Sequence, residues 1–140
     1  MLHVRNLALL EVMGEDAKPA EILLRSLLKT EETSQFSTMI FRALCSIDEE
    51  NIRFVFSQVH VFRLQTDAIV NLIITAKHNA LALELVGDLF FDPSTSIRLF
   101  CAQLVLMHMV PLPKRIIEKA LHNESEPDIR DLLKKILAEI

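Results

Sequence analysis

The most constraining feature of this chain is a pattern that recurs along nearly its whole length. An apolar residue is followed eight positions later by a second one, and the loop between them is mostly polar or contains helix breakers, least clearly at 62–68. The second apolar residues of the four copies are 33, 28 and 32 positions apart. The copies are Leu28–Phe36, Val61–Ile69, Leu89–Ile97 and Leu121–Ile129. This period is typical of repeats built from helix pairs, which bury their apolar faces by stacking on their neighbours.

The N-terminus matches the second half of such a copy. Val4-Arg5 lies 32 residues before Phe36 and corresponds to the pairs Ile97-Arg98 and Ile129-Arg130 of the later copies. Either the chain belongs to a longer array of repeats, or this segment is a helix that caps the N-terminal end of the array. We favour the longer array.

From the second apolar residue of each copy onward, the apolar residues are spaced as in amphipathic helices. Ile97, Phe100, Cys101 and Leu104 recur at intervals of three and four residues, and the other copies are similar. Composition agrees, because only two of the 140 residues are Gly and 51% are hydrophobic. The sequence therefore predicts an all-α protein of about nine helices, near 2–13, 19–29, 34–47, 50–62, 66–78, 80–91, 95–109, 113–122 and 127–139.

Residues 52–62 are the least regular part of this prediction. Their density of Val and Phe favours a strand on propensity alone. A single strand between helices would have no partner to pair with, so a helix is predicted here too. Asp48, Glu49 and Glu50 support its start, because negative charge is favourable at a helix N-terminus.

The Ile-Arg pairs, each preceded by an acidic turn that contains proline, resemble the HEAT-like α-solenoid repeat in its short form. The resemblance implies a right-handed α-solenoid of about four helical hairpins plus an N-terminal half-repeat, forming one domain over 1–140. It also implies that an acidic loop residue and an arginine early in the second helix link neighbouring repeats. In this chain the acidic residues would be Asp92 and Glu124, and the arginines Arg98 and Arg130.

The chain departs from that family in two respects. Its period of 28–33 residues is shorter than the ~40–47 of standard HEAT and armadillo repeats. The middle copies also lack the arginine, because Ser37 and Val70 occupy its position.

Composition and motifs argue against most kinds of chemistry. A net charge of −4 is unfavourable for binding nucleic acid. Zinc-binding, phosphate-binding and nucleophile-elbow motifs are absent from the sequence, so neither a metal, a cofactor nor an enzymatic activity is expected. Cys45 and Cys101 are expected to be buried free thiols of a cytoplasmic protein. The longest uncharged run, 99–113, is too short to span a membrane.

An excess of apolar residues outside the main stripes is the strongest sign of function. These residues either pack against first helices of adjacent repeats or form an exposed groove for a partner protein. The second interpretation predicts a non-enzymatic protein-interaction or scaffolding module, with a homo-oligomer left open. Its expected binding residues are Phe41, Ile74, Lys77, Leu99, Gln103 and Leu106.

Two alternatives stay open at this point. Short HEAT-like repeats also resemble subunits of bilin lyases, which would make the chain an accessory or lyase-like subunit of an enzyme system. HEAT-like DNA glycosylases are a precedent for nucleic-acid binding, but the acidic composition weighs against that alternative.

Overall fold

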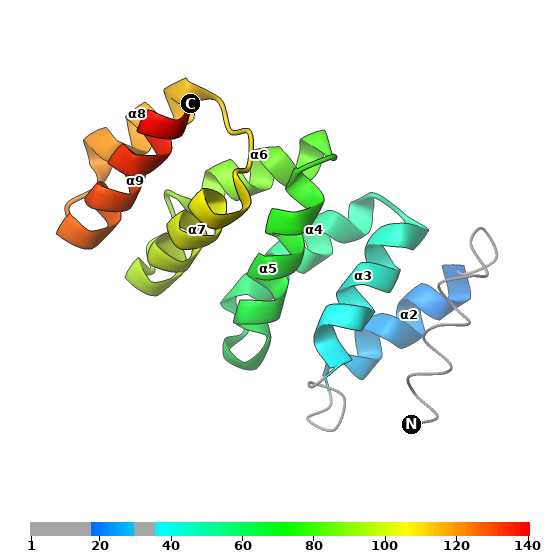
Figure 1. Ribbon diagram of the computed structural model, residues 1–140. Coiled ribbons are helices and arrows are strands. Elements are labelled where there is room, and N and C mark those ends of the chain that lie inside the picture. The colour runs from blue at the N-terminus through cyan, green and yellow to red at the C-terminus, as the bar shows by residue number, and fades with distance from the viewer. Residues whose placement is uncertain (1–17, 30–35) are drawn as a thin grey trace. The chain divides into compact units, whose positions relative to one another are not determined.

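The computed structural model describes residues 18–29 and 36–140, and this part of the chain is all-helical (Figure 1). It contains α2 to α9 and two short 3₁₀ turns, with no strand among the described residues. The chain divides into two compact units, 1–71 and 72–140, and the division lies within α5 (Gln65–Ala76). We describe each unit by itself.

Unit 1 contains α2 (Lys18–Leu27), α3 (Ser37–Ile47) and α4 (Glu50–Ser57), and α3 packs against both of the others. The side chain of Asn51 joins these helices: its Nδ2 donates to the carbonyl oxygen of Leu44 (2.8 Å), and its Oδ1 accepts from Arg25 (2.6 Å). Asn51 is completely buried, so these bonds replace the water that it loses on folding.

Unit 2 contains two helical hairpins, α6 (Ala80–Leu89) with α7 (Thr95–His108) and α8 (Lys114–Asn123) with α9 (Pro127–Glu139). The second helices, α7 and α9, lie side by side (Figure 1). The core consists of aliphatic side chains with almost no exposure, among them Leu89, Ile97, Ile117 and Leu133. Ile97 and Leu133 fall on the apolar stripes predicted for the second helices, and Leu89 ends the preceding helix, whereas Ile117 in α8 lies on no predicted stripe.

The predicted helices after residue 18 are confirmed, with shifts of a few residues at their ends. The helix near 2–13 lies outside the described residues. The prediction of one repeat domain over 1–140 stays a prediction.

The prediction for 50–62 is correct only as far as Ser57. The chain then forms 3₁₀ turns at Gln58–His60 and Phe62–Leu64, separated by Val61 in an extended conformation. Val59 and Leu64 are buried on either side of this break, and Arg63 donates a hydrogen bond to the carbonyl oxygen of Leu28. These tertiary contacts replace the last helical turn.

Candidate functional site: an uncharged surface on α7

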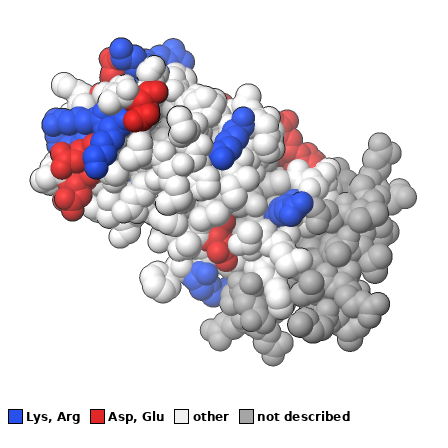
Figure 2. All heavy atoms as spheres, viewed as in Figure 1, with Lys and Arg blue, Asp and Glu red and all other residues white. Residues whose placement is uncertain are grey.

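The exposed side of α7 carries no ionised side chain. Its outward residues are Leu99, Gln103, Leu106 and Met107, which we call the α7 surface; Gln103 and Met107 are exposed and the two leucines half-buried. In Figure 2 the charged atoms of unit 2 gather over α8 and α9, whereas the neighbouring region over α7 is almost entirely uncharged. The α7 surface therefore offers apolar and amide contacts.

Local interactions set both ends of α7. At its start the hydroxyl of Ser94 accepts a hydrogen bond from the backbone N–H of Ile97 (3.4 Å), and the Asp92 carboxylate accepts from the N–H of Ser94 (2.9 Å). At its end Met109 adopts the left-handed conformation (φ 53°), and its N–H bonds the carbonyl oxygen of Val105. This conformation ends the helix and leaves the Met109 side chain 72% exposed.

A hollow of about 290 Å³, which we call the C-terminal hollow, adjoins the α7 surface. It lies where the ends of α7 and α9 meet the loop before α8. Of its lining residues, Glu139 alone has an ionisable side chain, and Ile140 at its edge is 61% exposed. The full lining consists of Val105, Leu106, Met109, Val110, Pro111, Leu112, Ile136, Glu139 and Ile140.

The predicted binding residues are distributed unevenly. Leu99, Gln103 and Leu106 share the α7 surface. Ile74, at the C-terminal end of α5, is 47% exposed, and Lys77 just beyond it is also exposed.

The outward position predicted for Phe41 is wrong, because its side chain is completely buried. Since α3 packs against two helices, its buried face is broader than one apolar stripe and includes Phe41. The C-terminal hollow was not predicted. The only signal in the sequence is the run Val110-Pro111-Leu112-Pro113, where the uncharged segment 99–113 ends in prolines.

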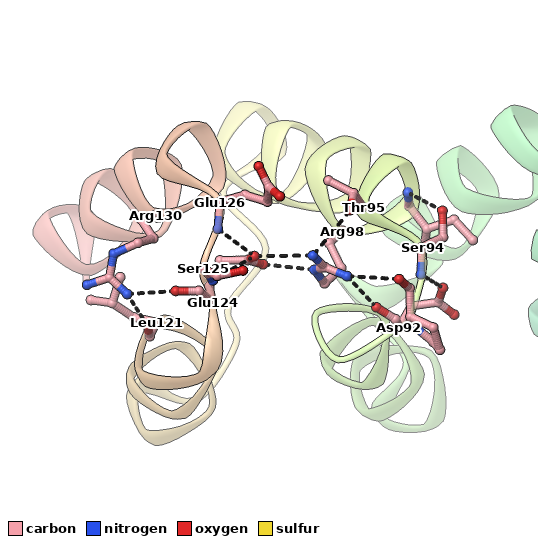
Figure 3. A network of polar contacts seen from close by, with 11 residues as sticks. Asp92, Ser94, Thr95, Arg98, Leu121, Glu124, Ser125, Glu126 and Arg130 are labelled. Carbon is pink, nitrogen blue, oxygen red and sulfur yellow. Dashed lines mark hydrogen bonds and ion pairs between the residues drawn. The ribbon is translucent and has the colours of Figure 1, made fainter.

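An ion pair links the two hairpins of unit 2 (Figure 3). Arg98 Nε lies 2.9 Å from Glu124 Oε1, and a second guanidinium nitrogen lies 3.3 Å from Oε2. Only 16% of the Arg98 side chain and 3% of the Glu124 side chain are exposed. Glu124 also accepts from the N–H groups of Ser125 and Glu126, both at 3.1 Å. One carboxylate thus orders its own loop and holds the preceding hairpin.

These contacts determine the protonation of Glu124. Burial alone would raise the pKa of this carboxyl group. The hydrogen bonds from Arg98, Glu126 and Ser125, together with the positive charge of Arg98, outweigh burial and lower the pKa below its ordinary value. Glu124 is therefore held in its ionised form.

Arg98 and Arg130 make equivalent contacts with their own loops. Arg98 donates to the carbonyl oxygens of Asp92 (2.9 Å) and Pro93 (3.2 Å). Arg130 donates to those of Glu124 (2.8 Å) and Leu121 (2.7 Å). In both cases an accepting carbonyl lies six residues before the arginine. Of the side-chain pairings that the resemblance implies, the structure contains Arg98–Glu124.

A similar link occurs in unit 1, where the equivalent position holds a serine. The hydroxyl of Ser37 donates to a carboxylate oxygen of Asp67, in the first turn of α5. Ser37 is completely buried, and Asp67 is half-buried. The position that lacks arginine thus still donates to an acidic residue close to the start of the next second helix.

The thiols are poorly suited to nucleophilic chemistry. Cys101 is completely buried, and its Sγ donates to the carbonyl oxygen of Val86 (3.7 Å). Burial raises the pKa of Cys45 to about 11 and also raises the pKa of Cys101. Within residues 18–29 and 36–140, no cluster of His, Cys, Asp or Glu could hold a metal ion. In the same part of the chain, no helix has the length and apolar character needed to cross a bilayer.

The described residues thus define an all-α protein with an uncharged surface on one helix. Comparison of the chain with family models, curated proteins and solved structures found no match.

Proposed function

We propose that this protein is a right-handed α-solenoid of HEAT-like repeats that acts as a non-enzymatic protein-interaction or scaffolding module in the cytoplasm. Its partner would be another protein, which docks on the α7 surface and places an apolar side chain in the C-terminal hollow. About four hairpins and an N-terminal half-repeat would make up the array.

The repeat assignment is supported by two links whose donors occupy equivalent sequence positions. Arg98 bonds Glu124 within unit 2, and Ser37 bonds Asp67 within unit 1. In each case the donor directly follows the second apolar residue of a copy. The acceptor lies before the second apolar residue of the next copy, by five residues for Glu124 and by two for Asp67. A recurrent bond of this kind is expected where each repeat contacts chiefly its neighbours.

The binding role depends on one observation, the exposed apolar side chains of the α7 surface and of the adjoining C-terminal hollow. Met107, Met109 and Ile140 are 71%, 72% and 61% exposed. Grouped apolar side chains on a protein surface often mark interaction sites, and methionine adapts its shape to a partner. The free thiols of Cys45 and Cys101 are compatible with a reducing cytoplasm.

Site-specific photo-cross-linking in extracts of the source cells tests this function. A photoreactive amino acid replaces Gln103 on the α7 surface, and in a control protein it replaces the exposed Lys134 on α9. We expect Gln103 to cross-link one protein species that Lys134 does not.

The same experiment includes Met107→Lys, which puts a charge on the α7 surface, and Lys135→Met as the opposite change outside it. Met107→Lys should abolish the cross-link from Gln103 while the far-UV circular dichroism stays that of the wild type. Lys135→Met should leave the cross-link intact. Equal cross-linking from both positions, or a cross-link that survives Met107→Lys, would contradict the proposed function.

A further inference from the structure

A second hollow in unit 2 lies between the first helices of the two hairpins. It measures about 490 Å³, and we call it the α6–α8 groove. Its apolar lining includes Leu83 and Phe91 on the α6 side and Leu112 and Ile116 on the α8 side. Apart from Leu112, which also lines the C-terminal hollow, the α6–α8 groove shares no residue with the α7 surface or that hollow, so an inference from it does not depend on the proposed function.

The two walls of the groove carry opposite charges. Glu84 and Asp88 lie on α6, Arg115 and Lys119 lie on α8, and all four side chains are exposed. Among the described residues, no ion pair joins the two walls. Burial and the nearby charge of Glu84 raise the pKa of Asp88.

The floor of the groove is apolar and closely packed. Gly87 is buried, and a Cβ atom added there would lie 3.6 Å from Ile116 Cγ2 and 3.7 Å from Leu112 Cδ2. Phe91 remains 39% exposed, with Lys119 Nζ 5.4 Å from the centre of its ring. An aromatic side chain that is part-exposed beside a cation can supply both apolar area and a cation–π contact to a partner.

We propose that a second copy of this chain docks on the α6–α8 groove, related to the first by a two-fold axis parallel to the groove. Such a rotation places the acidic α6 wall of each copy against the basic α8 wall of the other. The apolar side chains of the two grooves, including Phe91 of each copy, are then enclosed between the charged walls.

The charge pattern selects a second copy over an unrelated partner. A two-fold interface uses the same patch on both subunits, so the patch must be complementary to itself. The acidic α6 wall and the basic α8 wall meet this requirement when the two-fold axis runs along the groove. A two-fold axis across the groove would place the acidic wall of one copy against the acidic wall of the other. The rim charges then fix the orientation of the dimer, and the apolar floor provides buried area.

Sedimentation equilibrium of the full chain over a wide range of protein concentration tests the proposal. We expect a reversible dimer that weakens at high salt. The double variants Glu84→Lys/Asp88→Lys and Arg115→Glu/Lys119→Glu should each raise the dimer dissociation constant by roughly tenfold or more, since like charges then face each other. An equimolar mixture of the two variants should form a heterodimer, because one has two basic walls and the other two acidic walls.

Matched charge reversals on exposed positions of α9, Asp128→Lys/Asp131→Lys and Lys134→Glu/Lys135→Glu, should leave dimerisation unchanged. If a reversal in the groove disturbs folding, as judged by circular dichroism, Glu84→Gln/Asp88→Asn replaces it and should still weaken the dimer. A wild type that stays monomeric at every concentration would overturn the proposal. So would a dimer that survives both groove reversals, or a mixture that does not associate.

Discussion

Arg98 and Glu124 form a buried ion pair, with 2.9 Å between Nε and Oε1, across 26 residues of sequence. The pair joins the first turn of α7 to the loop before α9. Because the same arginine also binds the carbonyl oxygens of Asp92 and Pro93, it fixes the loop before its own helix as well. A single guanidinium thus connects both hairpins of unit 2.

Arg98→Ala should lower the free energy of unfolding by about 2–4 kcal/mol, because it leaves the buried Glu124 carboxylate without its counter-charge. Denaturant unfolding measures the loss. Lys134→Ala, at an exposed position, should change stability by no more than about 0.5 kcal/mol. Arg98→Met/Glu124→Leu should recover part of the loss, since it removes both buried charges but also the loop contacts of the two side chains.

We assign Arg98 to structure and not to binding. Cross-linking from Gln103, per folded molecule, should therefore survive Arg98→Ala. A variant that keeps its stability and loses the cross-link would contradict this assignment.

Glu124 should make stability depend on pH. Its pKa is lower in the folded state than the ordinary value of about 4.3 in the unfolded chain. The contribution of Glu124 to stability is therefore fully present when the pH is above the pKa of this group in the unfolded chain. It is lost as the pH falls through the pKa of the folded state. Unfolding curves should show the wild type more stable than Glu124→Gln at neutral pH, with the difference shrinking below about pH 5. A difference that is constant down to pH 3 would show that this carboxyl group is not responsible.

Ser37→Ala should cost about 1–2 kcal/mol, because it removes the donor to Asp67 at a completely buried position. The neighbouring Thr38 is exposed, so Thr38→Ala is a control that should change stability by no more than about 0.5 kcal/mol. Thermal and denaturant unfolding both report the effect. Equal effects of the two substitutions would remove the argument that the Ser37–Asp67 bond links α3 to α5.

The two methionines at the end of α7, Met107 and Met109, should respond to glycine substitution with changes in stability of opposite sign. Met109→Gly should raise the free energy of unfolding by about 0.5–1 kcal/mol, because glycine adopts the left-handed conformation of this residue without steric cost. Met107 lies inside the helix, so Met107→Gly should lower the free energy of unfolding by about 1 kcal/mol. Both residues are more than two-thirds exposed, so loss of packing contributes little to either value. The same sign for both would contradict the left-handed helix end.

The sequence predicted secondary structure well where the signal is local. The spacing of Ile97, Cys101 and Leu104 requires only the geometry of one helix, and all three residues are buried in α7 as expected. The acidic start of α4 is also local: the Asp48 carboxylate accepts from the N–H of Glu50 (3.1 Å). The end of the same helix was mispredicted, because buried Val59 and Leu64 depend on contacts beyond the helix.

The sequence by itself determined the approximate positions of the described helices and the apolar stripe of the second helices, because both follow from a period of 3.6 residues along one segment. Only the tertiary structure decided which of the remaining apolar side chains stay exposed. Phe41 is buried because α3 packs on two helices, whereas Met107 is exposed on the outward side of α7. Tertiary structure also selected Arg98 as the partner of Glu124, since a contact across 26 residues depends on how two hairpins pack.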